Sequence, residues 1–300
     1  MHDNVFALLT RVRSGVLPAM ATPITPDGYR VDLQAVTALA EFLIESGVSG
    51  LFAGGTTGEG LLLDLDQRCA LHEAAASAVA GRVPLLLHAG TNNTRDTRAL
   101  AEHAATLKPD AIVCVTPSFY GMPDDALLTY FRQIASLAPD IPFLAYDIPQ
   151  MAVNGVSPAL LGRMLETIPN FAGVKCSRAD AQVIRQLIDV AGNDAIVLAG
   201  NERIALASLA LGATGLISGL ATAIPEPFVT LTAAHAAGDT ETAQREQRRI
   251  NRLLDCLPVG QRIGAIKLIL QQRGIAAGPT VPPRPMPVDS DLWARLSALL

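Results

Sequence analysis

The chain carries PFLAYDIP at residues 142–149 and, after an interval long enough for a helix, FAGVKCS at residues 171–177. Both runs are almost continuously apolar, and neither alternates between apolar and polar residues. Further runs with this pattern are VLPAMATPI from Val16, GLFAG from Gly50, PLLLHAG from Pro84, AIVCVTPS from Ala111, AIVLAGN from Ala195 and GLISGLA from Gly215. Such runs are typical of strands buried on both faces of a parallel sheet.

The intervals between these runs carry helix start and stop signals. Asp32 is placed to cap a helix that Gly47 ends, and Asp66 to open one that Gly81 ends. Further helix starts are expected at Thr94 or Asp96, Asp124, Ser157, Asp180 and Glu202. Strands that recur every 20–35 residues or so, with a helix between them, predict an α/β fold of the (β/α)8 barrel type.

An open, doubly wound sheet is the alternative fold. It would need a phosphate-binding glycine fingerprint after its first strand, and ATPITPDG (21–28) is not one. We therefore expect residues 1–225 to form the barrel with the active site, including a short N-terminal extension over residues 1–14. Residues 226–300 are expected to form a helical region packed on the barrel.

The C-terminal region is expected to be mostly helical. Its predicted helices are Glu241–Leu257, Gly264–Arg273 and a short amphipathic one over Ser290–Leu300, and the proline-rich segment Gly278–Val288 is predicted to be extended.

Composition excludes several classes of protein. Half of the 300 residues are apolar and 17% are charged, which indicates a large folded core. The net charge of −5 and the lack of a basic stripe argue against a nucleic-acid partner. No apolar run is long enough to span a membrane. The four cysteines form no CxxC pair, and the first twenty residues contain charges unlike a secretory signal, so we expect a cytoplasmic protein.

Lysine is rare in this chain, which narrows the search for lysine chemistry to Lys108, Lys175 and Lys267. Lys175 lies inside the apolar strand of FAGVKCS. Burial there would lower the pKa of its amine and make it a nucleophile able to form a Schiff base with a ketone. The alternative is a strand-end lysine that reaches water or pairs with a carboxylate. Lys108 and Lys267 are predicted to be solvated or helix-end charges.

Two other features lie where strands end. Tyr146 could shuttle protons near a lysine on the next strand, or only pack with one hydrogen bond. The turn GGTTGEG (54–60) could bring backbone N–H groups, Thr56 and Thr57 to a small carboxylate, or could be a tight turn that needs glycine and nothing more. His88 has no partner at metal-ligand spacing and is interpreted as a core histidine.

Together these pieces resemble a known family. GTTGE after the second strand, YxxP at the fifth and GxK at the sixth are similar to the dihydrodipicolinate synthase / N-acetylneuraminate lyase family of class I Schiff-base lyases, over about residues 14–225. The resemblance implies that Lys175 forms an iminium with pyruvate or another 2-oxo acid. It also implies that Tyr146 shuttles the proton and that Thr56 belongs to a hydroxyl relay beside it.

The resemblance extends to substrate binding and assembly. It implies that Thr57 binds the carboxylate of the 2-oxo acid, and that Gly200 and Ile217 line the pyruvate pocket. An iminium is its own electron sink, so no metal or organic cofactor is expected. The family usually forms dimers or dimers of dimers, so we expect a homo-oligomer.

Departures from the family pattern concern the rest of the substrate. Met151 stands where synthases usually have an arginine for a second carboxylate, and Arg203 could substitute for it. In GNER, Glu202 and Arg203 replace the acidic pair expected of a sialic acid lyase. Phe119 stands where a relay tyrosine is expected, with Tyr120 next to it.

We therefore expect a lyase that cleaves a 2-keto-3-deoxy sugar acid, or a related hydroxy-oxo acid, to pyruvate and an aldehyde. The enzymatic alternatives are condensation of pyruvate with an aldehyde, as in the synthases, and dehydration of a deoxy sugar acid. Because the relay pattern is altered, a non-catalytic 2-oxo acid binder or sensor on the same barrel is the alternative outside enzymes.

Overall fold

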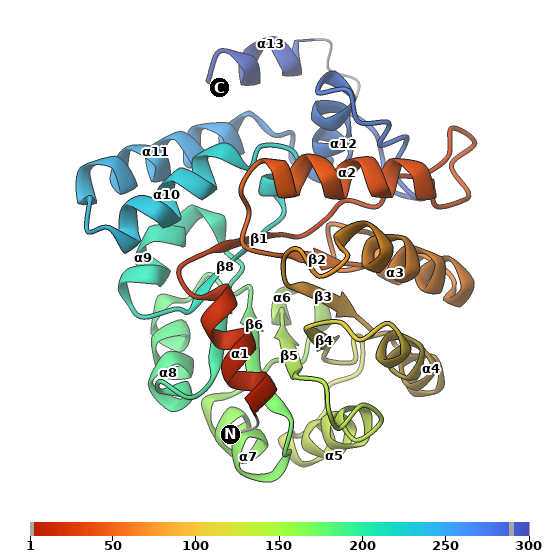
Figure 1. The fold of residues 1–300 in the computed structure, drawn as a ribbon, viewed down its shortest axis with the longest axis vertical. Helices are drawn as coiled ribbons and strands as arrows, with labels where there is room; N and C mark the ends of the chain where they lie inside the picture. Colours follow the sequence, from red (N-terminus) through yellow and green to blue (C-terminus); the bar gives the residue numbers. More distant parts are fainter. Residues whose placement is uncertain (1–2, 288–290, 300) are drawn as a thin grey trace.

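A computed structural model describes residues 3–287 and 291–299. Within this part of the chain eight parallel strands pair in the order β1-β8-β7-β6-β5-β4-β3-β2. A parallel bridge between Ala19 and Phe52 joins the first strand to the second and closes the (β/α)8 barrel (Figure 1). The strands are β1 Val16–Pro18, β2 Leu51–Ala53, β3 Leu85–His88, β4 Ala111–Val115, β5 Phe143–Asp147, β6 Phe171–Cys176, β7 Ile196–Ala199 and β8 Gly215–Ser218.

Helices surround this barrel and continue beyond it. The helices are α1 Asp3–Val12, α2 Leu33–Glu45, α3 Leu65–Val79, α4 Thr94–Thr106, α5 Asp124–Ala135, α6 Pro149–Ala152, α7 Pro158–Thr167, α8 Ala181–Ala191, α9 Ala205–Ala210, α10 Glu226–Ala236, α11 Thr240–Cys256, α12 Arg262–Gln272 and α13 Leu292–Ser297. The predicted fold class is confirmed, because every predicted apolar run contains one strand.

The capping residues of the helices can be compared with the helix starts predicted from the sequence. Asp32, Ser157 and Asp180 each accept a hydrogen bond from a backbone N–H of the first helical turn, as predicted. The prediction for Asp66 was wrong, because Asp64 makes the capping bond and Asp66 lies inside the first turn. Both are acidic and two residues apart, so composition alone cannot choose between them.

The three other predicted helix starts are confirmed, although the residue before each is the cap. Thr94 is the first residue of α4, which Asn93 caps. Asp124 is the first residue of α5. Glu202 opens a short 3-10 turn whose cap is Asn201.

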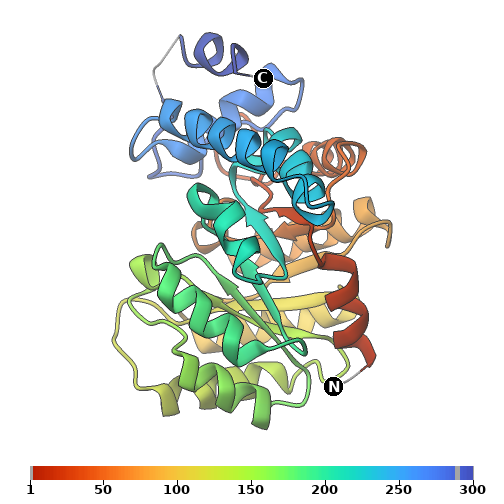
Figure 2. The ribbon, with the colours of Figure 1, turned by 90° about the vertical axis from the view of Figure 1, so that its left-hand side faces the viewer.

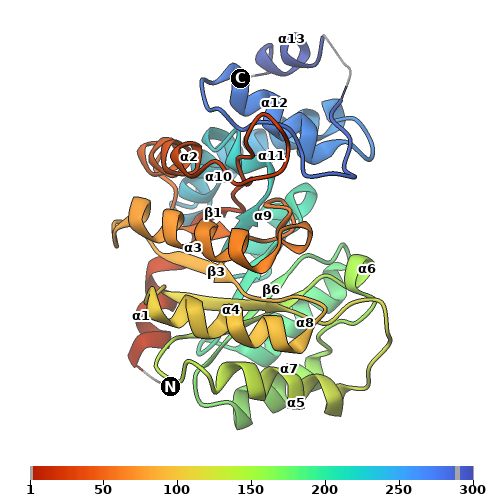
Figure 3. The same cartoon turned by 90° about the vertical axis from the view of Figure 1, so that its right-hand side faces the viewer.

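Two apolar layers hold the barrel together. One lies between the sheet and the surrounding helices, and the other fills the barrel interior. The interior layer includes the apolar face of α1, which closes the amino end of the barrel with Val5, Leu8, Leu9 and Val12. Figure 3 shows α1 at one end of the barrel and α6, which follows the carboxyl end of β5, at the other. Catalytic sites of such barrels lie at the carboxyl end.

The C-terminal helices stack on one side of the barrel (Figure 2). Helices α11 and α12 confirm the two predicted long helices to within two residues at each end. The segment 278–287 has no helix or strand, and α13 confirms the core of the last predicted helix. Val288, Ser290 and Leu300, which bound those last predictions, lie outside the described residues. No helix in the described ranges has the length and apolar character needed to cross a bilayer.

Candidate active site

Lys175 lies near the carboxyl end of β6, directly beside Tyr146 on β5. Its side chain is buried, and Nζ lies 3.8 Å from the centroid of the Tyr146 ring and 4.2 Å from that of Phe52. Burial lowers the pKa of Lys175 below its ordinary value of 10.5, although Tyr146 and Glu202 act to raise it. The amine is therefore more easily uncharged than an exposed lysine, which is the condition for nucleophilic attack on a carbonyl.

Tyr146 is linked to the turn that follows β2. Its hydroxyl is 3.1 Å from Oγ1 of Thr56, so the predicted hydroxyl contact is present across 90 residues of sequence. The tight conformation of this turn requires glycine. Gly54 has a φ of +74°, and a Cβ on Gly60 would lie 1.9 Å from the carbonyl oxygen of Gly54. The glycines thus shape the turn, and the threonines between them face the cavity.

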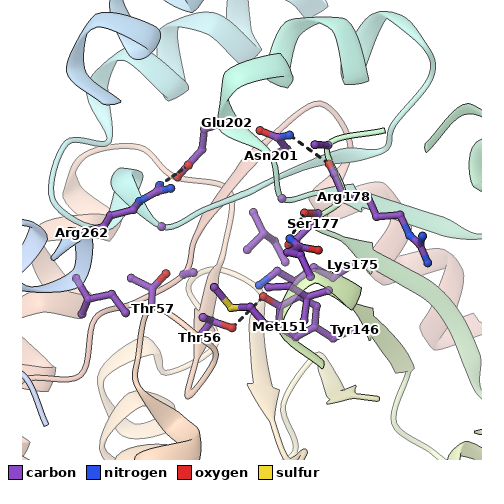
Figure 4. Close-up of a pocket in the computed structure, with 18 of the residues that line it drawn as sticks. Thr56, Thr57, Tyr146, Met151, Lys175, Ser177, Arg178, Asn201, Glu202 and Arg262 are labelled. Atoms are coloured by element: carbon purple, nitrogen blue, oxygen red, sulfur yellow. Dashed lines mark hydrogen bonds and ion pairs between the residues drawn. The ribbon is translucent and has the colours of Figure 1, made fainter. Parts of the chain in front are cut away.

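A cavity of about 840 Å³ opens at this end of the barrel (Figure 4). All the residues predicted for the site line it, namely Thr56, Thr57, Tyr146, Lys175, Gly200 and Ile217. Gly200 has no room for a side chain, because a Cβ there would lie 2.2 Å from Oγ of Ser177. The six positions, predicted from separate segments, therefore converge on one site.

A buried arginine that sequence reasoning missed supports the turn from behind. Arg68 is fully buried and donates hydrogen bonds to the carbonyl oxygens of Gly60 (3.2 Å), Gly90 (3.1 Å) and His88. Burial without a carboxylate lowers the pKa of Arg68 to about 10. His88 is buried and its Nδ1 lies 3.0 Å from the carbonyl oxygen of Gly54, which confirms it as a core histidine. Among the described residues, no His, Cys, Asp and Glu side chains gather as a metal site requires.

The prediction for Lys267 was wrong. It is fully buried on α12, its Nζ lies 2.7 Å from Oε2 of Glu59, and it donates a 2.7 Å hydrogen bond to the carbonyl oxygen of Pro279. The pair joins the GGTTGEG turn to the C-terminal region. Glu59 and Lys267 are far apart along the chain, so no local sequence pattern could have shown that they pair. Lys108 is exposed, as predicted.

Arginine placement also differs from expectation. Arg203 pairs with Asp255 at 2.8 Å and does not line the cavity, so it cannot replace the missing arginine at Met151. Arg262, from the C-terminal region, does line the cavity and forms an ion pair with Glu202. Figure 4 shows Arg262 and Glu202 on the side of the cavity away from Arg178.

Arg178 lines the cavity, but its guanidinium forms an ion pair with Asp147. Its Nε and Nη2 bind the two carboxylate oxygens of Asp147, and the Asp147 carboxylate is completely buried. The carboxylate also accepts a 2.9 Å hydrogen bond from the backbone N–H of Val156. Asp147 is thus a structural anchor for the segment after β5.

The altered tyrosine motif faces solvent. Phe119 and Tyr120 are 77% and 71% exposed, and neither lines the cavity. Their rings pack edge to face with centroids 5.1 Å apart. Within the described single chain, the hydroxyl contact of Tyr146 therefore goes to Thr56 and not to this motif.

Comparison with known proteins agrees with this geometry. The model of the dihydrodipicolinate synthetase family matches residues 12–300. The chain belongs to this family. The N-acetylneuraminate lyase of Rhizobium meliloti is 32% identical over 286 residues, which cover 95% of this chain and 94% of that protein. The 4-hydroxy-tetrahydrodipicolinate synthase of Methanopyrus kandleri is 30% identical over 269 residues, covering 90% and 89%.

Solved structures of the dihydrodipicolinate synthetase family share the whole architecture. A prophage protein of this family from E. coli K12, solved in complex with pyruvate, has a TM-score of 0.88 and 29% identity, and the match covers 95% of this chain and 97% of that one. Membership makes the chain a pyruvate-dependent class I carbon–carbon lyase rather than a binding or sensing protein. Relatives with two different reactions match about equally well, so family membership does not name the substrate.

Proposed function

We propose that the protein cleaves a 4-hydroxy-2-oxo acid, of the 2-keto-3-deoxy sugar acid type, into pyruvate and an aldehyde through a Schiff base on Lys175. The observation that carries this proposal is the buried Lys175 amine, which lies beside Tyr146 in a cavity large enough for a sugar acid. The hydroxyl pair Tyr146–Thr56 supplies a group that can move protons next to the amine.

In the proposed reaction the Lys175 amine adds to the C2 carbonyl, and the Tyr146 hydroxyl gives its proton to the C2 oxygen, which leaves as water and so gives an iminium. The Tyr146 oxygen, deprotonated in that step, then takes the proton of the C4 hydroxyl. The C3–C4 bond then breaks, its electrons pass into the iminium to form an enamine, and the aldehyde leaves. Protonation of C3 and addition of water release pyruvate and restore the amine.

Each remaining contact has a role in this scheme. Thr57 and the backbone of its turn bind the C1 carboxylate, while Gly200 and Ile217 shape the pocket around the pyruvate carbons. Thr56 holds the hydroxyl of Tyr146 and passes its proton on. Condensation of pyruvate with an aldehyde is the same path in reverse, and dehydration of a deoxy sugar acid is the remaining alternative.

The setting of the enzyme is part of the proposal. We place the active site in the barrel of residues 1–225, with residues 226–300 packed on it. Exposed apolar side chains, including Phe119, Tyr120, Met151 and Val153, support a homo-oligomer in which they meet a second subunit. We also propose a cytoplasmic location, which the free Cys114 and Cys176 thiols support. Burial raises the pKa of both thiols to about 12, which makes them unreactive.

A pyruvate-release assay tests this function. The purified protein is given a panel of 2-keto-3-deoxy sugar acids, and pyruvate is measured with lactate dehydrogenase and NADH. We expect release from at least one of them and none from the Lys175→Met variant. Dehydration without release of pyruvate would replace the proposed reaction, and release by the variant at the wild-type rate would remove Lys175 from it.

A further inference from the structure

The cavity carries more basic than acidic groups. Its basic side chains are Lys175, Arg178, Arg262 and Arg284, and its acidic ones are Asp180 and Glu202. Arg178 is occupied by Asp147, which lies behind it. Lys175 is assigned to the Schiff base by the proposed function. The two arginines of the C-terminal region are therefore left to explain.

Arg262 is held in place by a buried carboxylate that also accepts two other hydrogen bonds. Oε1 of the buried Glu202 accepts hydrogen bonds from Oγ of Ser218 (2.9 Å) and the backbone N–H of Leu220 (2.8 Å), while Oε2 binds Nη2 of Arg262. Burial acts to raise the pKa of Glu202, but Arg262 and these hydrogen bonds lower it by more. The pKa of Glu202 therefore lies below its ordinary value. Glu202 is thus an ionised anchor.

The anchored guanidinium still has donors to offer. The Arg262 side chain is 45% exposed, and in the described part of the chain its Nε and Nη1 make no hydrogen bond. An arginine that is fixed through one nitrogen still presents the N–H groups of the other two to a carboxylate or a phosphate. Figure 4 places this group on the far side of the cavity from Tyr146.

Arg284 adds a second positive charge at the cavity wall. Its backbone is fixed by two bonds, since its N–H donates to the carbonyl oxygen of Val281 (3.0 Å) and its own carbonyl accepts from Thr280 (2.7 Å). Its side chain lines the cavity, and none of the ion pairs among residues 3–287 and 291–299 includes it. An unpaired cation beside a substrate cavity raises the local concentration of anions.

We infer that the end of the substrate remote from the 2-oxo acid carries an anionic group, a carboxylate or a phosphate, which accepts hydrogen bonds from the free N–H groups of Arg262 close to the positive charge of Arg284. This inference rests on the proposed function and narrows its substrate class. It also explains how the site works without an arginine at Met151. The recognition has moved from the segment after β5 to the C-terminal region.

Matched aldehydes test the inference in the condensation direction. Pyruvate is combined with succinic semialdehyde or butanal, which differ in a terminal carboxylate, and with glyceraldehyde 3-phosphate or glyceraldehyde, which differ in a phosphate. We expect kcat/KM to be at least about tenfold higher for the charged member of one pair, and the pair that responds identifies the anion. Arg262→Gln should reduce that ratio by about 10- to 100-fold.

Two more variants separate recognition from folding. Arg203→Gln is the matched control, since this neighbouring arginine pairs with Asp255 outside the cavity, and it should leave the ratio unchanged. Arg284→Gln breaks no ion pair among the described residues, so this variant should fold. It should also reduce the ratio of kcat/KM values, and it therefore tests the inference even if Arg262→Gln does not fold.

Different results would overturn the inferred anion site and the proposed lyase function. Equal kcat/KM within both pairs, with turnover present, would overturn the inference and leave the proposed function standing. The inference would also be overturned if Arg262→Gln and Arg284→Gln lowered kcat/KM for charged and neutral aldehydes alike. No carbon–carbon bond formation with any aldehyde and no pyruvate adduct on Lys175 would instead overturn the proposed function.

Discussion

Replacing Lys267 with methionine removes one charge of a buried pair and leaves the other. Methionine replaces the aliphatic part of the lysine side chain and lacks only the terminal nitrogen, so the change tests mainly the charge and its hydrogen bonds. Glu59 would keep the 3.0 Å hydrogen bond from the backbone N–H of Val281 to Oε1. Its Oε2, whose contact in the described residues is the Lys267 ammonium at 2.7 Å, would have no partner.

The expected cost is large because both side chains are completely buried. Removing one partner of a buried ion pair destabilises a protein by about 3–5 kcal/mol. The carbonyl oxygen of Pro279 also loses its 2.7 Å hydrogen bond, which adds roughly 1 kcal/mol. We therefore expect Lys267→Met to lower the free energy of unfolding by at least about 3 kcal/mol, measured by urea denaturation followed by circular dichroism.

Two companion variants decide what such a loss means. Lys108→Met makes the same chemical change at an exposed turn and should alter the free energy by less than about 0.5 kcal/mol. The double variant Glu59→Gln with Lys267→Met removes both charges and should be about 2 kcal/mol more stable than Lys267→Met alone. If Lys267→Met unfolds within about 1 kcal/mol of the wild type, the ion pair does not anchor the turn and the reasoning fails.

Three further results are expected. Tyr146→Phe should lower kcat about 10²- to 10⁴-fold with little change in KM, measured by pyruvate release, and an unchanged kcat would rule out the proton shuttle. Lys175→Met should raise the free energy of unfolding by about 1 kcal/mol near pH 7 in urea, because it removes the cost of burying an ammonium whose pKa is lowered in the folded state. The rate at which pyruvate forms its adduct should rise with pH as Lys175 loses its proton and level off below pH 10.5, whereas a midpoint at or above 10.5 would contradict the burial effect.

The barrel and the Schiff-base residues could be predicted because their signals are local. A strand of a parallel sheet is buried on both faces and shows as a continuous apolar run, so each run contains one strand. A lysine is costly in such a run, which made Lys175 conspicuous. Tyr146 followed from its place on the neighbouring strand, and the two side chains do lie in register.

The rest of the site depends on contacts between distant segments. The sequence predicts a solvated or helix-end charge at Lys267, because its partner, Glu59, is far away along the chain. Arg262 gave no signal for the same reason, since its place in the cavity is set by Glu202 in the barrel. Arg203, nearer in sequence to the predicted site, turns away to Asp255. Sequence proximity favoured the wrong arginine, and three-dimensional packing selects the right one.

The central claim is that Lys175 forms a Schiff base with a 2-oxo acid. The most direct test is to incubate the protein with pyruvate, reduce it with borohydride, and locate the added mass by peptide mapping. We predict an adduct on Lys175 and none on Lys108 or Lys267. A folded protein that gains no adduct at Lys175 would contradict the claim.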